Sequence, residues 1–207
     1  MKTGYSELDN LLQKVNNEIT IIYGPASSGK TTLVKLASIQ LLKENKKVLF
    51  IDTEQGFSVE RFLQLTQNNK DLLKNLMILK PKSFYEQYRT IQSLEKTFNK
   101  FSLIILDTIG IFYRKELKKN QYLANKILDK QFQILKEISK TVPVLITNQV
   151  YSNLNTGNIN NVGGEMVRNW SNCLIQLKIK PRKIKIEKPF EFEAKMDIEE
   201  SGIKLIQ

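Results

Sequence analysis

The sequence predicts an α/β fold in which a mostly parallel sheet is flanked by helices and followed by antiparallel C-terminal strands. Three observations support this prediction. Through residue 149, short apolar runs that end in polar residues alternate with segments of helical periodicity. A glycine-rich loop separates the first of these runs from the helix that follows it. From residue 173 onwards, apolar and polar residues alternate in short runs, as is typical of antiparallel strands.

The expected elements follow one another in a regular order. Strands are expected over residues 19–22, 48–54, 76–79, 102–107 and 143–149, and helices over residues 4–12, 33–41, 58–68, 84–98 and 121–140. Residues 150–164 are small and polar without periodicity, and a loop of that length is usually functional or disordered. Because no repeat or linker divides the chain, we expect a single domain spanning residues 1–207.

The composition restricts the chemistry that this protein can perform. The 207 residues include one cysteine and no histidine, which excludes an internal disulfide and a zinc site built from cysteines. Any catalysis must therefore use carboxylates, lysine, hydroxyls, amides or a bound cation. No apolar run approaches the length of about 18 residues that a membrane helix needs, and polar residues follow Met1 directly. We expect a cytoplasmic protein with no membrane partner.

The charge of the chain suggests an anionic partner. The formal net charge is +11 and the isoelectric point is near 9.6, which favours nucleic acid first and an acidic membrane surface second. Only five of the 32 basic residues are arginines, so a general lysine bias of the source proteome is an alternative explanation. Local clusters of charge are therefore more informative than the total.

Two stretches of the chain concentrate basic residues. The first cluster comprises Arg114, Lys115, Lys118, Lys119 and Lys126, against the single acid Glu116. The second cluster comprises Lys178, Lys180, Arg182, Lys183, Lys185 and Lys188. Such clusters suit contacts with a phosphate backbone, although each could also be a solvated face without a ligand.

The loop over residues 24–31, GPASSGKT, has the spacing of a phosphate-binding P-loop. Its glycines let the backbone approach a polyphosphate, Lys30 can neutralise the β and γ oxygens, and the Thr31 hydroxyl can bind Mg²⁺. The alternative is a glycine-rich turn before an ordinary helix. The residues expected to bind the nucleotide here are Gly24, Pro25, Ala26, Ser27, Ser28, Gly29, Lys30, Thr31 and Thr32.

Three polar residues at or just beyond the ends of expected strands complete the candidate site. In parallel α/β sheets, ligands bind beyond the carboxyl ends of the strands. Asp107 follows the apolar run LIIL and is expected to hold Mg²⁺, unless it only caps the next turn. Glu54 could polarise the water that attacks the γ-phosphate, or it could be a surface carboxylate. Gln149 could sense the γ-phosphate and signal to the loop that follows. Lys30, Glu54 and Gln149 are the expected catalytic residues.

Five segments, in this order and at these separations, resemble the ATPase core of the RecA/RadA family of strand-exchange recombinases. They are GPASSGKTT, FIDTEQGFSVER, LIILDT followed by IFYR, LITNQV and NVGG. The similarity is closest to the archaeal and eukaryotic branch and to its core-only archaeal paralogue. The resemblance implies a RecA-like P-loop NTPase core that binds ATP and Mg²⁺. It also implies that the N-terminal helix-hairpin-helix domain and the polymerisation segment of the full recombinases are absent.

The resemblance implies roles for individual residues of the nucleotide site. Lys30 and Thr31 correspond to the phosphate and Mg²⁺ ligands, Glu54 to the residue that activates water, and Asp107 to the Walker B carboxylate. Arg61, seven residues past Glu54, corresponds to the arginine that stacks on adenine, a contact suited to a planar guanidinium.

The resemblance also implies two DNA-binding loops, around residues 114–126 and 150–164, with Gln149 as the nucleotide sensor at the entrance to the second. Besides the first basic cluster, the residues expected to contact DNA are Asn153, Asn155, Asn160 and Gly163. The nearby Tyr113, Tyr122 and Tyr151 could stack on bases or simply pack.

The chain departs from the recombinases in ways that bear on its activity. Gln55 stands where they have glycine, and the first loop lacks their glycine-containing, arginine-rich stretch, so efficient strand exchange is not expected. RecA-type ATPases generally hydrolyse ATP fast only when a neighbouring protomer completes the site. A core that forms no filament should therefore hydrolyse ATP slowly.

The leading hypothesis is an ATP- and DNA-binding accessory protein of DNA repair and homologous recombination with weak ATPase activity. Its expected partners are single-stranded or branched DNA, bound without sequence preference, and a full-length RadA recombinase or a junction-processing nuclease. One alternative is a RecA-fold regulatory ATPase that is driven by nucleotide and binds no DNA. The other is a P-loop kinase, for which the sequence offers no arginine-bearing lid.

Overall fold

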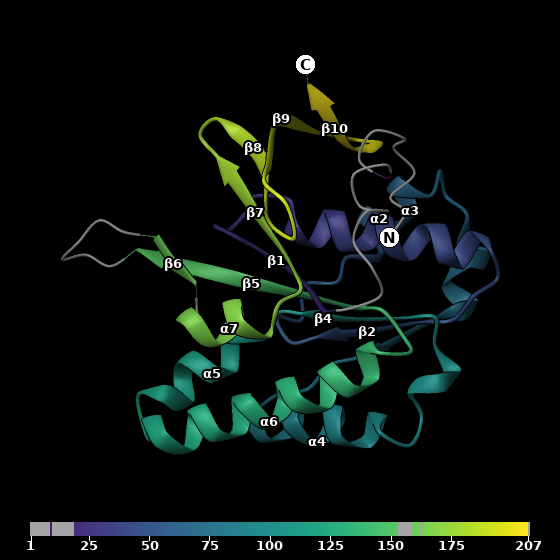
Figure 1. The fold of residues 1–207 in the computed structure, drawn as a ribbon. Helices are drawn as coiled ribbons and strands as arrows, with labels where there is room; N and C mark the ends of the chain where they lie inside the picture. The colour runs from purple at the N-terminus through teal and green to yellow at the C-terminus, as the bar shows by residue number, and fades with distance from the viewer. Residues whose placement is uncertain (1–8, 10–18, 153–158, 162, 207) are drawn as a thin grey trace.

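A central sheet carries helices on both of its faces (Figure 1). The computed structural model describes residues 9, 19–152, 159–161 and 163–206. The helix expected over residues 4–12 lies outside these residues, apart from Asp9.

The strands are β1 (Ile19–Gly24), β2 (Val48–Asp52), β3 (Leu76–Leu79), β4 (Leu103–Asp107), β5 (Val144–Ser152), β6 (Ile159–Asn161), β7 (Cys173–Ile179), β8 (Arg182–Lys188), β9 (Phe192–Glu199) and β10 (Gly202–Ile206). The helices are α2 (Lys30–Lys43), α3 (Val59–Leu65), α4 (Phe84–Leu94), α5 (Gly110–Leu117), α6 (Gln121–Ser139) and α7 (Gly164–Trp170), with short 3-10 helices over Lys70–Asn75 and Phe98–Lys100.

The strand order is β10-β9-β8-β7-β1-β5-β4-β2-β3, and β6 pairs with the end of β5. The strands from β7 through β3 in this order are parallel neighbours. From β7 to β10 the pairing is antiparallel. The expected α/β class, with antiparallel strands after residue 173, is confirmed.

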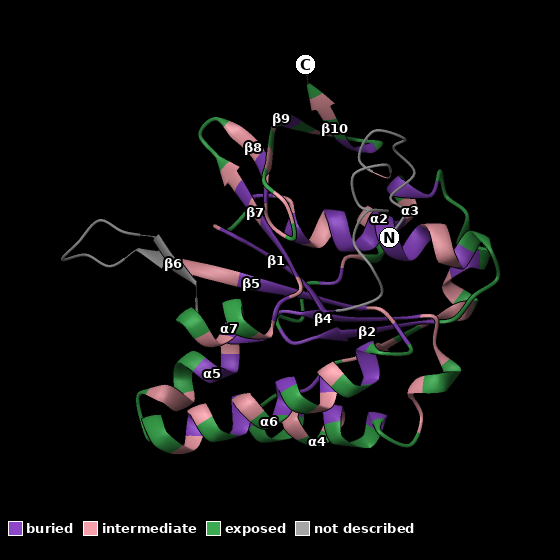
Figure 2. Ribbon diagram, viewed as in Figure 1, coloured by how far each residue is buried: buried purple, intermediate pink, exposed green. Residues whose placement is uncertain are grey.

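Two apolar layers hold the helices against the sheet. Successive strand residues alternate between the layers, so Ile22 packs with Val34 of α2 while Ile21 packs with Phe132 of α6. β1, β2 and β4 are buried along their length, as Figure 2 shows in purple, and β5 is buried from Val144 to Asn148. Because both faces are covered, these strands are continuous apolar runs in the sequence, and this is why they could be predicted.

The strand expected over residues 48–54 ends earlier, at Asp52. The Asp52 carboxylate accepts hydrogen bonds from the backbone N–H groups of Gly56 (3.1 Å) and Phe57 (2.9 Å), which turn the chain away from the sheet. Glu54 therefore lies in a tight loop beyond the strand. The helix expected over residues 84–98 likewise ends early, at Leu94.

The two expected DNA-binding loops contain more regular structure than predicted. Most of residues 114–126 is helical, because α5 extends to Leu117 and Asn120 caps α6 by accepting from the Leu123 N–H at 2.9 Å. In the second region, β5 continues to Ser152 and pairs with β6 as an antiparallel ribbon, and α7 follows. Among the described residues, no helix combines the length and the apolar character needed to cross a membrane.

Candidate nucleotide site and nucleic-acid interface

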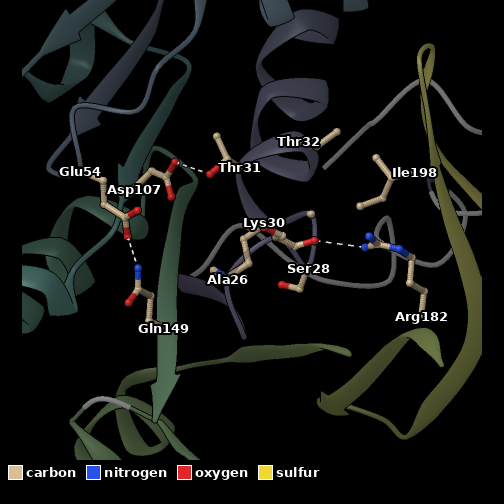
Figure 3. Close-up of a pocket in the computed structure, with 12 residues that line it drawn as sticks. Ala26, Ser28, Lys30, Thr31, Thr32, Glu54, Asp107, Gln149, Arg182 and Ile198 are labelled. Atoms are coloured by element: carbon tan, nitrogen blue, oxygen red, sulfur yellow. Dashed lines mark hydrogen bonds between the residues drawn. The ribbon is translucent and has the colours of Figure 1, made fainter. Parts of the chain in front are cut away.

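A cavity of about 430 Å³ opens at the carboxyl edge of the parallel strands (Figure 3). The strand register places Gly24 opposite Gln149 and Asp52 opposite Asp107, so the ends of β1, β5, β4 and β2 meet there. This is the edge at which open α/β sheets bind ligands. The residues that line the cavity are Ala26, Ser27, Ser28, Gly29, Lys30, Thr31, Thr32, Glu54, Asp107, Gln149, Arg182 and Ile198.

The P-loop joins β1 to α2 and forms one wall of the cavity. Gly29 has a φ of 101°, a backbone conformation that residues with a side chain rarely adopt. A Cβ at this position would lie 2.8 Å from Ile198 Cδ1. Gly29 is also the N-cap of α2, so no side chain caps the first N–H groups of this helix. Ser28 Oγ is buried and has no hydrogen-bond partner among the described residues. These donors at the start of a 14-residue helix fit a phosphate group.

Lys30 lies folded back onto the P-loop. Its ammonium donates hydrogen bonds to the backbone carbonyls of Gly24 (2.9 Å) and Pro25 (2.6 Å), and the residue is buried. Burial lowers the pKa of Lys30, while the charges of Asp107 and Glu54 oppose that shift. The loop therefore holds a buried cation close to two carboxylates, which an anionic ligand would stabilise.

Thr31 and Asp107 meet at the cavity floor. The Thr31 hydroxyl donates to Asp107 Oδ2 at 2.8 Å, and the Thr147 hydroxyl donates to Asp107 Oδ1. Burial raises the pKa of Asp107, while these two hydrogen bonds lower it. One hydroxyl and one carboxylate fit Mg²⁺, which usually keeps several waters and takes few protein ligands beside phosphate oxygens.

Glu54 and Gln149 lie next to each other on the side of the cavity opposite the P-loop, as Figure 3 shows. Gln149 Nε2 donates to Glu54 Oε1 at 2.6 Å. Burial is the main cause that raises the pKa of Glu54, and the charge of Asp107 adds to it, while the hydrogen bond from Gln149 lowers it. A carboxyl with a raised pKa is suited to act as a general base near neutral pH.

The loop that carries Glu54 is held on both sides. Asp52 fixes its backbone through the N–H groups of Gly56 and Phe57. The Lys35 ammonium of α2 lies 4.5 Å from the centre of the Phe57 ring. Gln55 has a φ of 57°, in the left-handed region that favours glycine. The chain thus keeps the backbone shape for which the recombinase glycine is suited, with a glutamine in its place.

Arg61 is a predicted nucleotide residue that does not line the cavity. Its guanidinium donates to the backbone carbonyls of Glu199 (2.8 Å) and Glu200 (3.1 Å), where β9 ends. The residue before them, Ile198, does line the cavity. Arg61 therefore contacts the outer end of the cavity wall, and its contact with adenine stays a prediction.

Two residues of the lining, Arg182 and Ile198, are not predicted as nucleotide residues. Arg182 begins β8 and Ile198 lies in β9, more than 150 residues along the chain from the P-loop. They reach the cavity because β7 pairs directly with β1. Periodicity identifies such strands but does not reveal which strand is the neighbour of which, so no local signal could have placed these two residues at the site.

The first basic cluster forms an exposed surface that we call the α5–α6 surface. It consists of Arg114, Lys115, Lys118, Lys119 and Lys126. Lys119 pairs with Glu116 at 3.1 Å. Within the described part of the chain, no carboxylate lies within ion-pair distance of the other four. Their charges are therefore available to an anionic ligand.

Two of the three tyrosines considered for base stacking can be compared. Tyr113 is buried and its hydroxyl donates to Asn125 Oδ1 at 2.6 Å, so of the two alternatives it packs. Tyr122 is 75% exposed at the start of α6, and the Lys126 ammonium lies 5.9 Å from the centre of its ring. An exposed aromatic ring beside lysines suits a single-stranded nucleic acid. The side chain of Tyr151 is outside the described parts.

The residues predicted in the second DNA-binding loop are only partly described. Asn153 and Asn155 lie outside the described residues. Asn160 falls in β6, where it is paired with Tyr151 of β5. Gly163 precedes α7 with a φ of 87°. These four residues stay predictions as DNA contacts.

The second basic cluster, which we call the hairpin surface, is partly neutralised. Its members are Lys178, Lys180, Arg182, Lys183, Lys185 and Lys188. Glu193 of β9 lies 3.3 Å from Lys178 and 2.5 Å from Lys183, and these lysines lower the pKa of Glu193. Lys188 donates to the Arg168 carbonyl at 2.7 Å. The expectation that this run is a phosphate-binding surface is weakened by these partners.

The parallel sheet, the P-loop after β1 and the polar residues at the ends of β2, β4 and β5 define a RecA-like P-loop nucleotide-binding core. Comparison with known proteins agrees with this class, because the Rad51 family model matches residues 1–205. The chain belongs to the Rad51 family and, within it, to the RadB proteins. This confirms the resemblance to the RecA/RadA recombinases and to their core-only paralogue.

The similarity to individual RadB proteins extends over most of the chain. A DNA repair and recombination protein RadB of Methanocaldococcus jannaschii is 38% identical over 200 residues, covering 91% of this chain and 93% of the relative. The protein of the same name from Methanobrevibacter smithii is 34% identical, with 84% and 79% covered. A crystal structure of the RadB recombinase matches with a TM-score of 0.81 at 30% identity, covering 100% of this chain and 99% of that one. The RecA-like fold, which generally binds ATP with Mg²⁺, is confirmed.

Proposed function

We propose that this chain is an ATP- and DNA-binding accessory protein of DNA repair and homologous recombination, with weak ATPase activity. The curated relatives are named as DNA repair and recombination proteins. The observation that carries the proposal for this chain is the hydrogen bond between Gln149 and Glu54. It joins the candidate water-activating residue to β5, the strand that continues from the nucleotide cavity to the predicted second DNA-binding loop.

ATP binding is supported by the P-loop and the floor of the cavity. The uncapped start of α2 and Lys30 would bind the phosphates, and Thr31 and Asp107 would hold Mg²⁺. The Mg²⁺ ion would neutralise phosphate charge. Arg61 would contact the adenine from the outer end of the wall formed by β9.

Weak hydrolysis is supported by the state of Glu54. In the present arrangement its carboxylate accepts a hydrogen bond from Gln149, which makes Glu54 a weaker base toward a water. A phosphate that competes for the Gln149 amide would release Glu54 to act as the general base. The same change at Gln149 would alter the start of the β5–β6 ribbon. Nucleotide state could in this way switch the affinity for DNA.

DNA binding is supported by the α5–α6 surface. Four exposed cations without carboxylate partners in the described structure, with Tyr122 beside them, suit a phosphate backbone and unstacked bases. Contacts of this kind carry no sequence preference. The proposed partners are therefore single-stranded or branched DNA, and a full-length RadA recombinase or a junction-processing nuclease that acts on such DNA.

The test is the binding of labelled single-stranded and branched DNA across a salt series, with and without ATP and Mg²⁺, together with phosphate release. Salt-sensitive binding that changes with nucleotide, and slow phosphate release, are expected. Lys30→Ala is the control, because it should remove the nucleotide effect and leave nucleotide-free DNA binding unchanged. Absence of DNA binding at low salt would overturn the DNA part and favour a regulatory ATPase driven by nucleotide. Transfer of phosphate to a small acceptor would favour a kinase.

A further inference from the structure

Arg182 reaches the nucleotide cavity from a hairpin that the proposed site does not otherwise use. β7 runs parallel to β1, with Tyr23 opposite Gln176, so the turn between β7 and β8 lies beside the P-loop. The packing between them is tight, because a Cβ on Gly24 would collide with the Leu177 carbonyl. The paired backbone of β7 and β8 therefore determines where the Arg182 side chain starts.

The guanidinium of Arg182 is directed at the loop that would bind phosphate. Its Nη1 donates to the backbone carbonyl of Ser27 at 3.1 Å, and the side chain lines the same cavity as Lys30 and Asp107. Figure 3 shows it on the side of the P-loop away from Glu54. A guanidinium has five N–H donors in a planar fork, so most of them are left for another acceptor.

The charge of Arg182 differs from that of its neighbours on the hairpin. Lys178 and Lys183 both pair with Glu193, whereas the partner of Arg182 is a neutral carbonyl. Within the described structure, no carboxylate lies within ion-pair distance of this guanidinium. An arginine with a neutral partner at the edge of a cavity is suited to bind a phosphate through two parallel hydrogen bonds.

The charge balance of the cavity also favours such a role. Besides Arg182, the cation among the residues that line the cavity is Lys30, and the carboxylates of Glu54 and Asp107 already offset the charge of Lys30. A polyphosphate adds several negative charges, of which one Mg²⁺ ion neutralises only part. A second cation is therefore needed on the phosphate, and the residue that the fold supplies is Arg182.

We propose that Arg182 binds the polyphosphate of the nucleotide held by its own chain. Each protomer then has a complete set of phosphate-binding residues without a contribution from a neighbouring copy. This inference rests on the proposed binding of ATP. It concerns affinity for the phosphates and involves neither adenine recognition nor proton transfer.

The first experiment measures the binding of a fluorescent ATP analogue, with adenosine as a ligand that lacks phosphate. Arg182→Ala should weaken binding of the ATP analogue by roughly 10- to 100-fold, the range expected for charge-assisted hydrogen bonds, and leave binding of adenosine unchanged. Arg182→Lys should recover part of the loss. The matched control is Lys180→Ala, which removes one charge from the same turn and should bind the ATP analogue like the unmodified protein.

Each outcome of this experiment decides something different. If the unmodified protein fails to bind the ATP analogue, the proposed function fails and this inference fails with it. If the unmodified protein binds and Arg182→Ala binds equally well, the inference alone is overturned. Equal losses for Arg182→Ala and Lys180→Ala would also overturn it, because they would point to general charge. Melting temperatures of all variants should match within the error of the measurement, and Arg182→Gln replaces Arg182→Ala if they do not.

A second experiment distinguishes action within a chain from action between chains. Arg182→Ala is mixed with an excess of Lys30→Ala, which has an intact Arg182 but a disabled P-loop. If Arg182 acts within its own chain, the mixture should bind the ATP analogue as weakly as Arg182→Ala alone, and affinity should not depend on protein concentration. Recovery of affinity in the mixture would overturn the proposal and assign Arg182 to the site of a neighbouring copy.

Discussion

The α5–α6 surface and the hairpin surface are similar in sequence and different in the folded protein. Both are lysine-rich runs of about a dozen residues that the sequence analysis treats alike. On the hairpin surface, Lys178 and Lys183 both pair with Glu193, which offsets one of their two charges. On the α5–α6 surface, Lys119 pairs with Glu116, and the remaining cations are exposed without such partners in the described structure.

The difference shows how the element that carries a charge determines its availability. In the antiparallel part of the sheet, side chains of neighbouring strands lie close together, so the long side chains of Lys178 on β7 and Lys183 on β8 both reach Glu193 on β9. At the junction of two helices, the side chains spread outward and meet fewer partners. We therefore expect DNA to bind at the α5–α6 surface, and the hairpin surface to stabilise the sheet and present Arg182 to the nucleotide.

The largest expected effect comes from neutralising the α5–α6 surface. The variant combines Arg114→Gln, Lys115→Gln, Lys118→Gln and Lys126→Gln. Affinity for single-stranded DNA should fall by about 100-fold or more at moderate salt, because binding to phosphates dominates such affinity. The slope of log affinity against log salt should decrease by about 0.7 for each phosphate that the variant no longer neutralises. Fluorescence anisotropy across a salt series measures both quantities.

The matched control removes four charges from the hairpin surface. It combines Lys178→Gln, Lys180→Gln, Lys183→Gln and Lys185→Gln. Its affinity for DNA should stay within a few-fold of that of the unmodified protein, because most of these charges are already paired. A larger loss for this control than for the α5–α6 variant would show that the DNA surface has been assigned to the wrong region.

A smaller effect is expected for Tyr122→Ala. Loss of a stacking platform should weaken binding of single-stranded DNA by about 10-fold, since stacking contributes about 1–3 kcal/mol per base. Duplex DNA should be affected much less, and the salt slope should not change. The control is Tyr85→Ala, which removes an exposed tyrosine of α4, outside both basic surfaces. Equal effects on single-stranded and duplex DNA would contradict a stacking role.

A gain in affinity is expected for Glu193→Gln. This change releases Lys178 and Lys183 from their carboxylate partner, so binding of DNA should become a few-fold tighter with a steeper salt slope. Because the two lysines lower the pKa of Glu193, the pairing should operate throughout the neutral pH range. An unchanged salt slope would mean that pairing with Glu193 is not the reason why the hairpin surface contributes little to DNA binding.

The smallest effect concerns the pH dependence of phosphate release. Glu54 must be deprotonated to act as a base, and its pKa is raised, so activity should be lost on acidification at a higher pH than an ordinary glutamate predicts. In the nucleotide-free site, Gln149→Ala removes a hydrogen bond that lowers this pKa, so the midpoint of kcat/KM, which reports the free enzyme, should move to still higher pH. The four-residue hairpin variant should leave the midpoint unchanged. A midpoint that Gln149→Ala does not move would argue against Glu54 as the base.

Much of the nucleotide site could be predicted from local sequence. The P-loop, Asp107 and Gln149 interrupt or end apolar runs, and parallel strands bring such ends to one edge of the sheet. The structure places Lys30, Thr31, Asp107, Glu54 and Gln149 around one cavity, as expected. These positions follow from spacing along the chain and from the direction of each strand, both of which a single sequence contains.

Other features depend on which strands become neighbours, and a single sequence does not contain that information. The pairing of β7 with β1 brings Arg182 to the P-loop, and the register of β8 with β9 places Glu193 opposite Lys185 and within reach of Lys183. The course of β9 places the carbonyls that bind Arg61. Local pattern therefore determined the candidate phosphate and metal residues of this protein. Tertiary pairing decided which of its many cations have carboxylate partners and which line the candidate nucleotide cavity, because such contacts depend on distances between residues that are remote in the chain.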